Sequence, residues 1–237
     1  MNCLLIEPEE IDAASGIARI VGRRRRHAQE ILGSRAGDWL RVGVLGGRMG
    51  RGRILGLDDD RLELAVELES DPPPKRPLEL VLALPRMPVF RRLLSTAASL
   101  GVERLLVVAT ARTEKSFWQS RDVSAEAIRE RLLLGLEQAR DTVLPEVELH
   151  RHFPSLVERV LPARLSGRRG LLAHPAAARP CPHRVEGPIT LFVGPEGGLL
   201  DEEVERLAAI GFEPVHLGVR ILRVEPVVPL LVGRLLD

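Results

Sequence analysis

The segment ITLFVGPEGGLLDEEVERLAAIG, residues 189–211, joins an apolar run, a glycine-rich turn and an acidic run with helical spacing. Its first five residues predict a strand, and Asp201–Ile210 predicts a helix that Gly211 is suited to end. Because ligands of open α/β sheets bind beyond the carboxyl ends of the strands, the turn Gly194–Gly198 is a candidate binding loop. The segment therefore indicates an α/β fold with a site at the end of this strand.

Strands and helices alternate along the chain after residue 77. Leu78–Leu84 is a nearly continuous apolar run, typical of a parallel strand buried on both faces. The patterns predict strands at Arg104–Ala109, Val147–Phe153, Gly170–Ala173 and Pro214–Leu217, and helices at Val89–Leu100, from Ser124 to about Arg140 and at Ser155–Leu165. We expect an α/β domain with a parallel sheet and helices on both faces.

The pattern before residue 71 is different, with short elements and frequent glycines. Trp39–Val44 and Leu62–Leu68 alternate as half-buried strands do, and Gly46-Gly47 predicts a hairpin turn into Arg51–Leu57. Only His27–Leu32 has helical spacing in this region. We expect a small β-barrel of about 70 residues.

A proline-rich segment separates the two regions. Asp71–Pro77 has four prolines in seven residues, which fix backbone angles and remove hydrogen-bond donors. It predicts a stiff, extended linker. The expected organisation is a β-barrel over residues 1–71, a linker over 72–77 and an α/β domain over 78–237.

Composition excludes several classes of protein. The 237 residues are 45% hydrophobic, and 34 basic side chains nearly cancel 33 acidic ones, which excludes a polycation, an acidic tail protein and a disordered chain. No apolar run reaches the roughly 18–20 residues of a membrane span, and the first residues do not resemble a signal peptide. Two cysteines cannot make a disulfide framework. We expect a soluble, cytoplasmic protein with no membrane association.

The small net charge conceals a basic region near the N-terminus. From Arg19 to Arg53 the chain has ten Arg against Glu30 and Asp38, a formal balance of +8. The run of Arg23, Arg24, Arg25 and Arg26 is a candidate for contacts with nucleic-acid phosphates. A solvated basic turn is the alternative interpretation, and the residues alone favour neither.

The glycine-rich turn differs from two common nucleotide-binding motifs. Gly194-Pro195-Glu196-Gly197-Gly198 is not G-x-G-x-x-G, and no Gly-Lys-Ser/Thr follows it. Nicotinamide dinucleotides and nucleoside triphosphates are therefore disfavoured as ligands. Gly197 and Gly198 can take positive φ and let a ligand approach the backbone. An ordinary strand-to-helix turn is the alternative interpretation.

Two further loops place polar residues after a predicted strand. Leu217–Glu225 joins a glycine turn to two arginines and a glutamate, and Arg220 and Arg223 share a face if this stretch is helical. A surface ion pair between one of these arginines and Glu225 is the alternative interpretation. Ala173-His174-Pro175 is the third candidate loop.

Taken together, these features resemble the 16S rRNA (uracil-N3) methyltransferases of the SPOUT superfamily, which use S-adenosylmethionine. The resemblance runs almost end to end and is most specific in the pair of loops Leu191–Gly198 and Leu217–Glu225. It also includes the Arg-rich start with His27, Ala36-Gly37-Asp38, Leu82-Ala83-Leu84-Pro85, Arg112–Trp118 and Leu136–Arg140.

The resemblance implies an N-terminal PUA-like RNA-binding domain and a C-terminal trefoil-knotted domain. It further implies a homodimer with each active site near the dimer interface, and methylation of N3 of a uridine in the 16S rRNA of the small ribosomal subunit. The residues that it assigns to S-adenosylmethionine are Ala173, His174, Val193, Gly194, Glu196, Gly197, Gly198, Leu217, Gly218, Ile221, Leu222 and Arg223.

Methylation of N3 needs help from the protein, because this nitrogen carries a proton at neutral pH. The site must supply a base or stabilise an N3 anion, and an arginine can stabilise charge that develops on O2 or O4. In the loop that the resemblance selects, we expect Arg223 to face that charge and Glu225 to order the site, with Arg220 as the third catalytic candidate. The N3 edge pairs in a duplex, so the uridine must be unpaired or flipped out.

Three residues in and directly after the last loop depart from the family pattern. Val219 stands where the family usually has proline, and Pro226-Val227 stands where it has Thr-Ala. Proline is tolerated in the first turn of a helix, so we expect the fold to survive. Two alternatives follow: a knot-fold protein that binds RNA or the ribosome with weakened or lost methyl transfer, and a methyltransferase that acts on another RNA.

Other conspicuous side chains have structural interpretations. We expect Phe117 and Trp118 to cover a core edge or build a dimer interface rather than to stack on a base. His150 and His152 share one face of a strand without a third ligand, and Cys181-Pro182-His183 predicts a loop, so we expect no metal site.

Overall fold

The computed structural model describes residues 2–236. By contact, the chain divides into two compact units: Met1–Pro74 together with Leu133–Leu144, and Lys75–Leu132 together with Pro145–Asp237. No pattern in the sequence indicates that residues 133–144 pack with the N-terminal strands. The domain limits and the linker over residues 72–77 stay a prediction.

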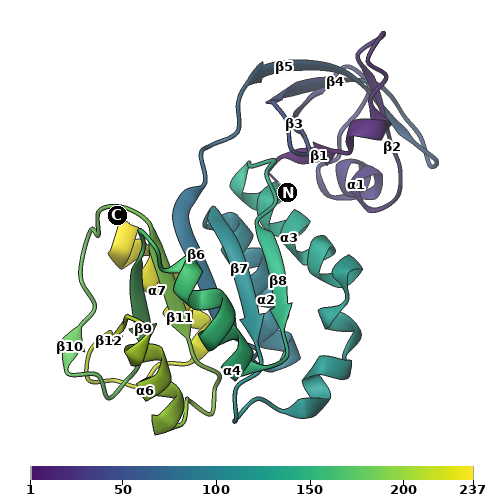
Figure 1. Cartoon of the computed structure of the whole chain (residues 1–237). Helices are drawn as coiled ribbons and strands as arrows, with labels where there is room; N and C mark the ends of the chain where they lie inside the picture. Colours follow the sequence, from purple (N-terminus) through teal and green to yellow (C-terminus); the bar gives the residue numbers. More distant parts are fainter. Residues whose placement is uncertain (1, 237) are drawn as a thin grey trace. The chain divides into compact units, whose positions relative to one another are not determined.

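A five-stranded sheet forms most of the first unit (Figure 1). Its elements are β1 (Leu4–Ile6), the 3₁₀ turn η1 (Pro8–Glu10), β2 (Ile17–Ile20), α1 (Gly22–Arg26), the π-helical turn η2 (His27–Ile31), β3 (Trp39–Val44), β4 (Met49–Leu57) and β5 (Leu62–Ser70). The strand order is β1-β3-β4-β5-β2, and every neighbouring pair is antiparallel except β1 and β3. The predicted strands at β3, β4 and β5 are confirmed, whereas β1 and β2 are too short to show a periodic pattern.

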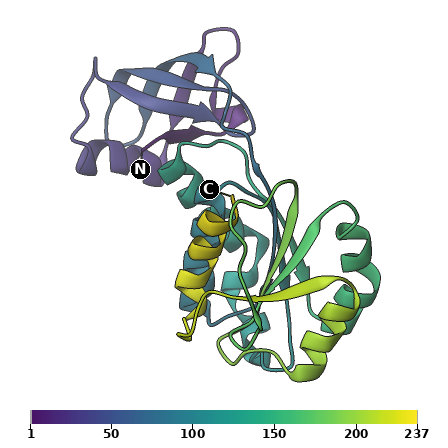
Figure 2. The ribbon, with the colours of Figure 1, turned by 90° about the vertical axis from the view of Figure 1, so that its left-hand side faces the viewer.

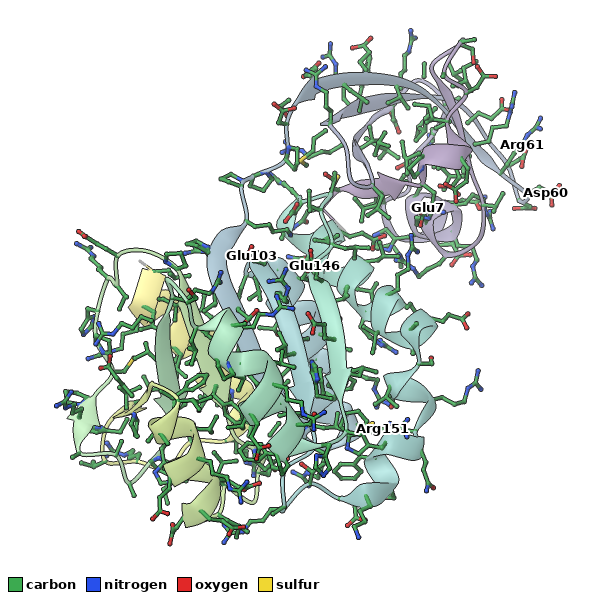
Figure 3. The ribbon with its side chains drawn as sticks, viewed as in Figure 1. Glu7, Asp60, Arg61, Glu103, Glu146 and Arg151 are labelled. Atoms are coloured by element: carbon green, nitrogen blue, oxygen red, sulfur yellow. The ribbon has the colours of Figure 1, made fainter. Side chains whose placement is uncertain are left out.

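Alternation along these strands separates a core face from a solvent face. Val42, Ile54 and Leu64 are among the residues of a buried apolar cluster inside the unit. The hairpin between β4 and β5 ends at a turn that contains Asp60 and Arg61, which Figure 3 shows at the edge of the unit. The strand pairing gives a five-stranded sheet but does not by itself identify a PUA-like barrel, so that assignment stays a prediction.

The basic run Arg23–Arg26 lies in helix α1, so its interpretation as a solvated turn is wrong. Besides Arg23, which pairs with Glu137 at 2.6 Å, two of its guanidinium groups bind protein groups of the same unit. Arg24 pairs with Glu10 at 2.6 Å, and the buried Arg25 donates a hydrogen bond to the Asp58 carbonyl at 3.0 Å. These two side chains therefore stabilise the unit itself, because each satisfies a partner within it.

The second unit contains a seven-stranded sheet and its covering helices. The elements are β6 (Arg76–Ala83), α2 (Met87–Ser99), β7 (Val102–Val108), the 3₁₀ turns η3 (Lys115–Gln119) and η4 (Arg121–Val123), α3 (Ala125–Ala139), β8 (Glu146–His150), α4 (Phe153–Ser155), the π-helical turn η5 (Leu156–Val160), α5 (Leu161–Arg164), β9 (Arg169–Ala173), β10 (Arg179–Pro180), β11 (Ile189–Val193), α6 (Asp201–Ala209), β12 (Phe212–His216) and α7 (Val224–Leu236). Helix α3 continues into the residues that belong to the first unit.

Every strand pair in this sheet is parallel, in the order β10-β12-β9-β11-β6-β7-β8. This confirms the predicted parallel α/β sheet. The predicted strand Val147–Phe153 is too long, because Phe153 begins a helix whose N-terminus His152 caps through a hydrogen bond from the Ser155 amide at 3.4 Å. The two-residue strand β10 was not predicted, since it carries no periodic signal.

Helices cover both faces of the sheet, as Figures 1 and 2 show. On one face, α4, η5, α5 and α6 pack on a buried cluster that includes Val81, Leu106 and Phe192. The Phe192 ring makes edge-to-face contacts with Phe153 and Phe212, with centroids 6.2 and 6.1 Å apart. On the opposite face α2 and α7 lie side by side. Across residues 2–236, no helix is both long enough and apolar enough to span a bilayer.

Candidate active site

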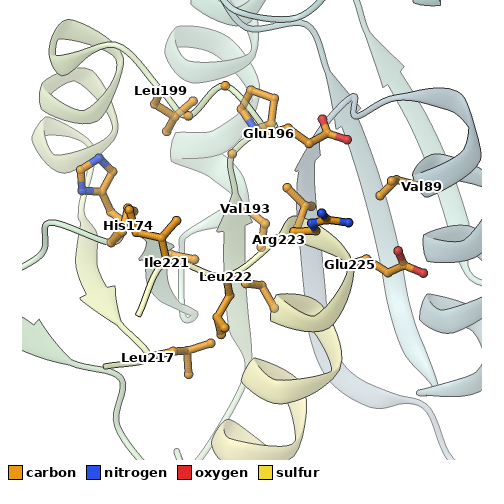
Figure 4. Close-up of a pocket in the computed structure, with 18 of the residues that line it drawn as sticks. Val89, His174, Val193, Glu196, Leu199, Leu217, Ile221, Leu222, Arg223 and Glu225 are labelled. Carbon is orange, nitrogen blue, oxygen red and sulfur yellow. The ribbon is translucent and has the colours of Figure 1, made fainter. Parts of the chain in front are cut away.

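The loops that follow β9, β11 and β12 meet around one pocket at the carboxyl ends of these strands (Figure 4). Its volume is about 650 Å³. The lining includes every residue predicted for the cofactor or for catalysis: Ala173, His174, Val193, Gly194, Glu196, Gly197, Gly198, Leu217, Gly218, Arg220, Ile221, Leu222, Arg223 and Glu225. Residues from three separate loops are thus brought to one place, and the role of each stays a prediction.

The turn after β11 is closed by its own backbone and by an arginine from elsewhere in the unit. The Gly198 amide donates to the Pro195 carbonyl at 2.9 Å, and Gly198 has φ +73°, as predicted. Gly197 is not among the described residues with positive φ, so only Gly198 uses this freedom. A Cβ at Gly197 would instead lie 3.3 Å from the Arg112 Cβ, which shows that this glycine makes room for a neighbouring side chain.

Arg112 is a pocket residue whose role the sequence did not indicate. Its Nη1 donates to the Gly197 carbonyl at 2.7 Å, so a cation from the loop after β7 holds the turn after β11. The buried Glu203 of α6 joins the same two loops, because its carboxylate accepts from the Ala111 amide at 2.8 Å and from the Leu200 amide at 2.9 Å. The shape of the pocket therefore depends on a loop that follows a fourth strand.

The other two loops are also held by backbone contacts near the strand ends. The His174 amide donates to the Val215 carbonyl at 2.9 Å, which ties the end of β9 to β12. His216 Nδ1 accepts from the Gly218 amide at 2.9 Å, and Gly218 has φ +121°, a conformation that favours glycine. Beyond this turn the chain is open to solvent, since Ile221 is 84% exposed.

Glu225 binds an arginine that was not among the candidates. Both Glu225 carboxylate oxygens accept from Arg92 of α2, one of them at 2.9 Å from Nη2. The alternative in which Arg220 or Arg223 forms the ion pair with Glu225 is therefore wrong. The hydrogen bond from Arg92, helped by the charges of Arg92 and Arg223, holds the pKa of the Glu225 carboxyl below its usual value. Arg92 lies inside a predicted helix, and nothing in that helical pattern distinguishes it.

Arg220 and Arg223 line the pocket as free cations. Within the part of the chain that the structure describes, neither guanidinium has a hydrogen bond or an ion pair, and both residues are exposed. Figure 4 shows Arg223 near Glu225 and Glu196 on the side of the pocket that faces Val89 of α2. Glu196 itself accepts from the Arg86 amide at 3.2 Å.

The pocket lining has more positive than negative side chains. Five arginines stand against Glu196 and Glu225, and both carboxylates already have an arginine partner. The remaining positive charge can stabilise an anionic group in or beside the pocket.

The sequence profile of the RNA methyltransferase domain family matches residues 72–235, which include all residues of the pocket lining named above. The chain belongs to this family.

Individual relatives of this RNA methyltransferase domain protein match it over nearly its whole length. Ribosomal RNA small subunit methyltransferase E of Treponema pallidum is 29% identical over 231 residues, which cover 95% of this chain and 86% of the relative. The protein of the same name from Mycobacterium tuberculosis is 26% identical over 239 residues, covering 98% and 91%. The likeness is thus spread over both units.

Solved structures share the fold. A ribosomal RNA small subunit methyltransferase E from Neisseria gonorrhoeae, bound to S-adenosylmethionine, superposes with a TM-score of 0.75 at 19% identity, covering 98% of this chain and 95% of that one. A Legionella pneumophila structure in complex with the same cofactor gives a TM-score of 0.74 at 19% identity, with the same coverage.

The tryptophan and histidine that the sequence analysis singled out at Trp118 and His150 lie outside the pocket lining. Trp118 is buried, as predicted for a core edge, and the Arg151 guanidinium lies 5.6 Å from its ring centre. Figure 3 shows Arg151 at the end of the sheet opposite Glu146. His150 contacts Glu148 at 3.1 Å. Over residues 2–236 no three His, Cys, Asp or Glu side chains are grouped to hold a metal ion.

Proposed function

We propose that the protein transfers a methyl group from S-adenosylmethionine to N3 of a uridine in the 16S rRNA of the small ribosomal subunit, in the cytoplasm. One observation carries this proposal. All residues assigned to the cofactor and to catalysis line one pocket, in a chain of the RNA methyltransferase domain family. Relatives named for methylation of small-subunit rRNA support the choice of substrate.

The size and the lining of the pocket support its assignment to the cofactor. Its volume of about 650 Å³ lies within the usual range for small-molecule sites. Backbone groups of three loops surround it, and apolar side chains such as Val193 and Leu222 form part of its wall. We assign the cofactor to the loops at Ala173–His174, Val193–Gly198 and Leu217–Arg223. When bound, S-adenosylmethionine supplies an electrophilic methyl group.

The chain's own residues have separate tasks in this proposal. Arg223 is unpaired and exposed to the pocket, so it is available to stabilise charge on the uridine oxygens. Glu225 is bound by Arg92, and its lowered pKa makes it a weaker base. This favours Glu225 as a positioning residue rather than as the acceptor of the N3 proton. Arg220 is the second free cation.

RNA binding by the first unit is part of the proposal. Arg24 and Arg25 have internal partners, so contacts with phosphates fall mainly to Arg23 and Arg26, which are exposed. Arg23 also pairs with Glu137 at 2.6 Å, so its guanidinium group must be shared between Glu137 and an RNA phosphate. We further propose a PUA-like barrel for this unit, a trefoil knot in the second unit and a homodimer.

Two measurements test the function. Calorimetry should show saturable binding of one S-adenosylmethionine per chain, and purified protein should transfer methyl to small subunits that lack the modification. Digestion of the product to nucleosides should give 3-methyluridine. A matched control is Arg159→Gln, which removes an exposed arginine that is not part of the pocket lining and should leave both results unchanged.

The outcomes separate the alternatives. Cofactor binding without transfer to any RNA would favour an RNA-binding protein that has lost catalysis. Transfer to tRNA in preference to small subunits would favour another RNA substrate. No cofactor binding by the folded protein would contradict the proposed function.

A further inference from the structure

A second hollow of about 410 Å³ adjoins the pocket within the same unit. Its lining includes Arg91, Arg92, Ser95 and Thr96 of α2, Arg131 of α3 and Glu225 of α7. Arg92 and Glu225 line both hollows, so the ion pair between them forms a shared wall. The two hollows are therefore neighbouring parts of one surface.

Positive charge dominates this second hollow. Among the described residues that line it, three guanidinium groups stand against one carboxylate, that of Glu225. Arg91 is held by Asp122 at 2.8 Å, whereas Arg131 has no ion pair or side-chain hydrogen bond anywhere in residues 2–236. Arg92 uses Nε and Nη2 on Glu225, which leaves the donors of Nη1 available.

Hydroxyl groups accompany the arginines. Ser95 Oγ donates to the Arg131 carbonyl at 2.8 Å, which fixes α2 against α3 at the hollow. The half-buried Thr96 hydroxyl has no hydrogen-bond partner among the described residues. Free guanidinium donors beside a free hydroxyl match the oxygens of a phosphate group. This lining favours an anion over a metal ion, since Glu225, its one carboxylate among the described residues, is already bound by an arginine.

We propose that this hollow is a phosphate subsite, which binds a backbone phosphate of the RNA strand whose target base enters the adjoining pocket. The inference rests on the proposed function, because it takes the pocket to hold that base. A flipped base remains joined to its sugar and phosphates, so backbone phosphates must lie beside the pocket mouth. Arg131 and Arg92 Nη1 then contact a phosphate while Arg92 keeps its bond to Glu225.

The test uses Arg131→Gln, with Arg159→Gln as the matched control and Arg131→Lys as the variant that retains the charge. Arg131 does not line the main pocket, so cofactor binding should be unchanged. Affinity for small subunits that lack the modification should fall about tenfold in Arg131→Gln, since a charge-assisted contact is lost. The slope of log affinity against log salt should become shallower by about 0.7. Arg131→Lys should recover most of the affinity.

Equal affinity and equal salt slope for Arg131→Gln and Arg159→Gln would overturn the subsite, as would wild-type protein that does not bind the subunits. Titration with inorganic phosphate separates two sources of the same group. Phosphate binding that Arg131→Gln abolishes, with subunit affinity unchanged, would mean that the hollow takes a free phosphate and not the RNA backbone. Failure of the proposed function is distinct: subunits bind in a manner that depends on Arg131, but no methyl group is transferred.

Discussion

The second unit holds two arginine–glutamate clusters that differ in burial. Glu79 of β6 has no exposed surface, and its carboxylate lies 3.4 Å from Arg104 Nη1 and 3.6 Å from Arg164 Nη1. Glu225 and its partner Arg92 have side chains that are 40% and 54% exposed. Both clusters pair the same residue types, and the second lines the pocket of the candidate active site.

Burial decides what each cluster can do. The Glu79 carboxylate is removed from water and depends on its protein partners. Thr190 Oγ1 also donates to it at 3.4 Å, and Arg104 in turn binds Glu146 at 2.5 Å. Such a network cannot exchange partners without exposing a buried charge. Around Glu225, water can replace a partner at small cost, so these groups are free to bind a ligand. The difference separates a structural cluster from a functional one.

The largest effect on stability is expected from Glu79→Ala. The change removes the buried partner of Arg104 and Arg164, although Arg104 retains Glu146 and Arg164 retains Glu148. The free energy of unfolding should fall by about 3 kcal/mol. Urea unfolding of this variant beside Glu158→Ala checks it, since Glu158 pairs with Arg206 at 3.6 Å on the surface and its loss should change stability by less than about 1 kcal/mol. Equal stabilities of the two variants would remove the distinction drawn from burial.

The largest effect on activity is expected from Arg223→Gln. If Arg223 stabilises developing charge, the rate of methyl transfer should fall by about 10²–10³-fold, as when one donor of an oxyanion site is removed. Thermal unfolding should not change, because Arg223 is exposed. Single-turnover rates on small subunits measure the effect. A rate within a factor of two of the wild type would exclude Arg223 from the reaction and leave Arg220 as the candidate.

A smaller effect is expected from Arg92→Gln, and it depends on pH. Because Arg92 lowers the pKa of Glu225, the pair stabilises the fold above the ordinary pKa of a glutamate, and this contribution is lost as the pH falls through the lowered value. In Arg92→Gln the titration midpoint of Glu225 should move upward toward the ordinary value. Carboxyl NMR titration of both proteins checks the shift. An unchanged midpoint would show that Arg92 does not control this carboxylate in solution.

The smallest effect is expected from restoring two of the three family residues, by Val219→Pro with Pro226→Thr. Neither residue lines the pocket, and Val219 is 96% exposed. Pro226 lies in the first turn of α7, where proline is tolerated. We expect the affinity for S-adenosylmethionine to change by less than about twofold, as measured by calorimetry. A tenfold gain would show that these departures impair the site.

Strong local patterns predict most of the α/β unit. Continuous apolar runs predicted β6 and β11, because a strand buried on both faces has no polar alternation. The loops at Gly194–Gly198 and Leu217–Glu225 were identified from residue types that follow such strands. The family resemblance then grouped them with Ala173–His174, and the structure brings all three loops to one pocket.

Local sequence carries little information about partners that are distant along the chain. Arg92 and Glu225 are 133 residues apart, and Arg112 lies 85 residues from the Gly197 carbonyl that it binds. Likewise, nothing in the Arg23–Arg26 run shows that Arg25 is buried against a later hairpin. Periodicity reports which face of an element is apolar, and so the sequence by itself determined the strands, the helices and the candidate loops. Which arginine binds which carboxylate, and which remain free for a ligand, depends on side chains that only the tertiary fold brings within hydrogen-bond distance.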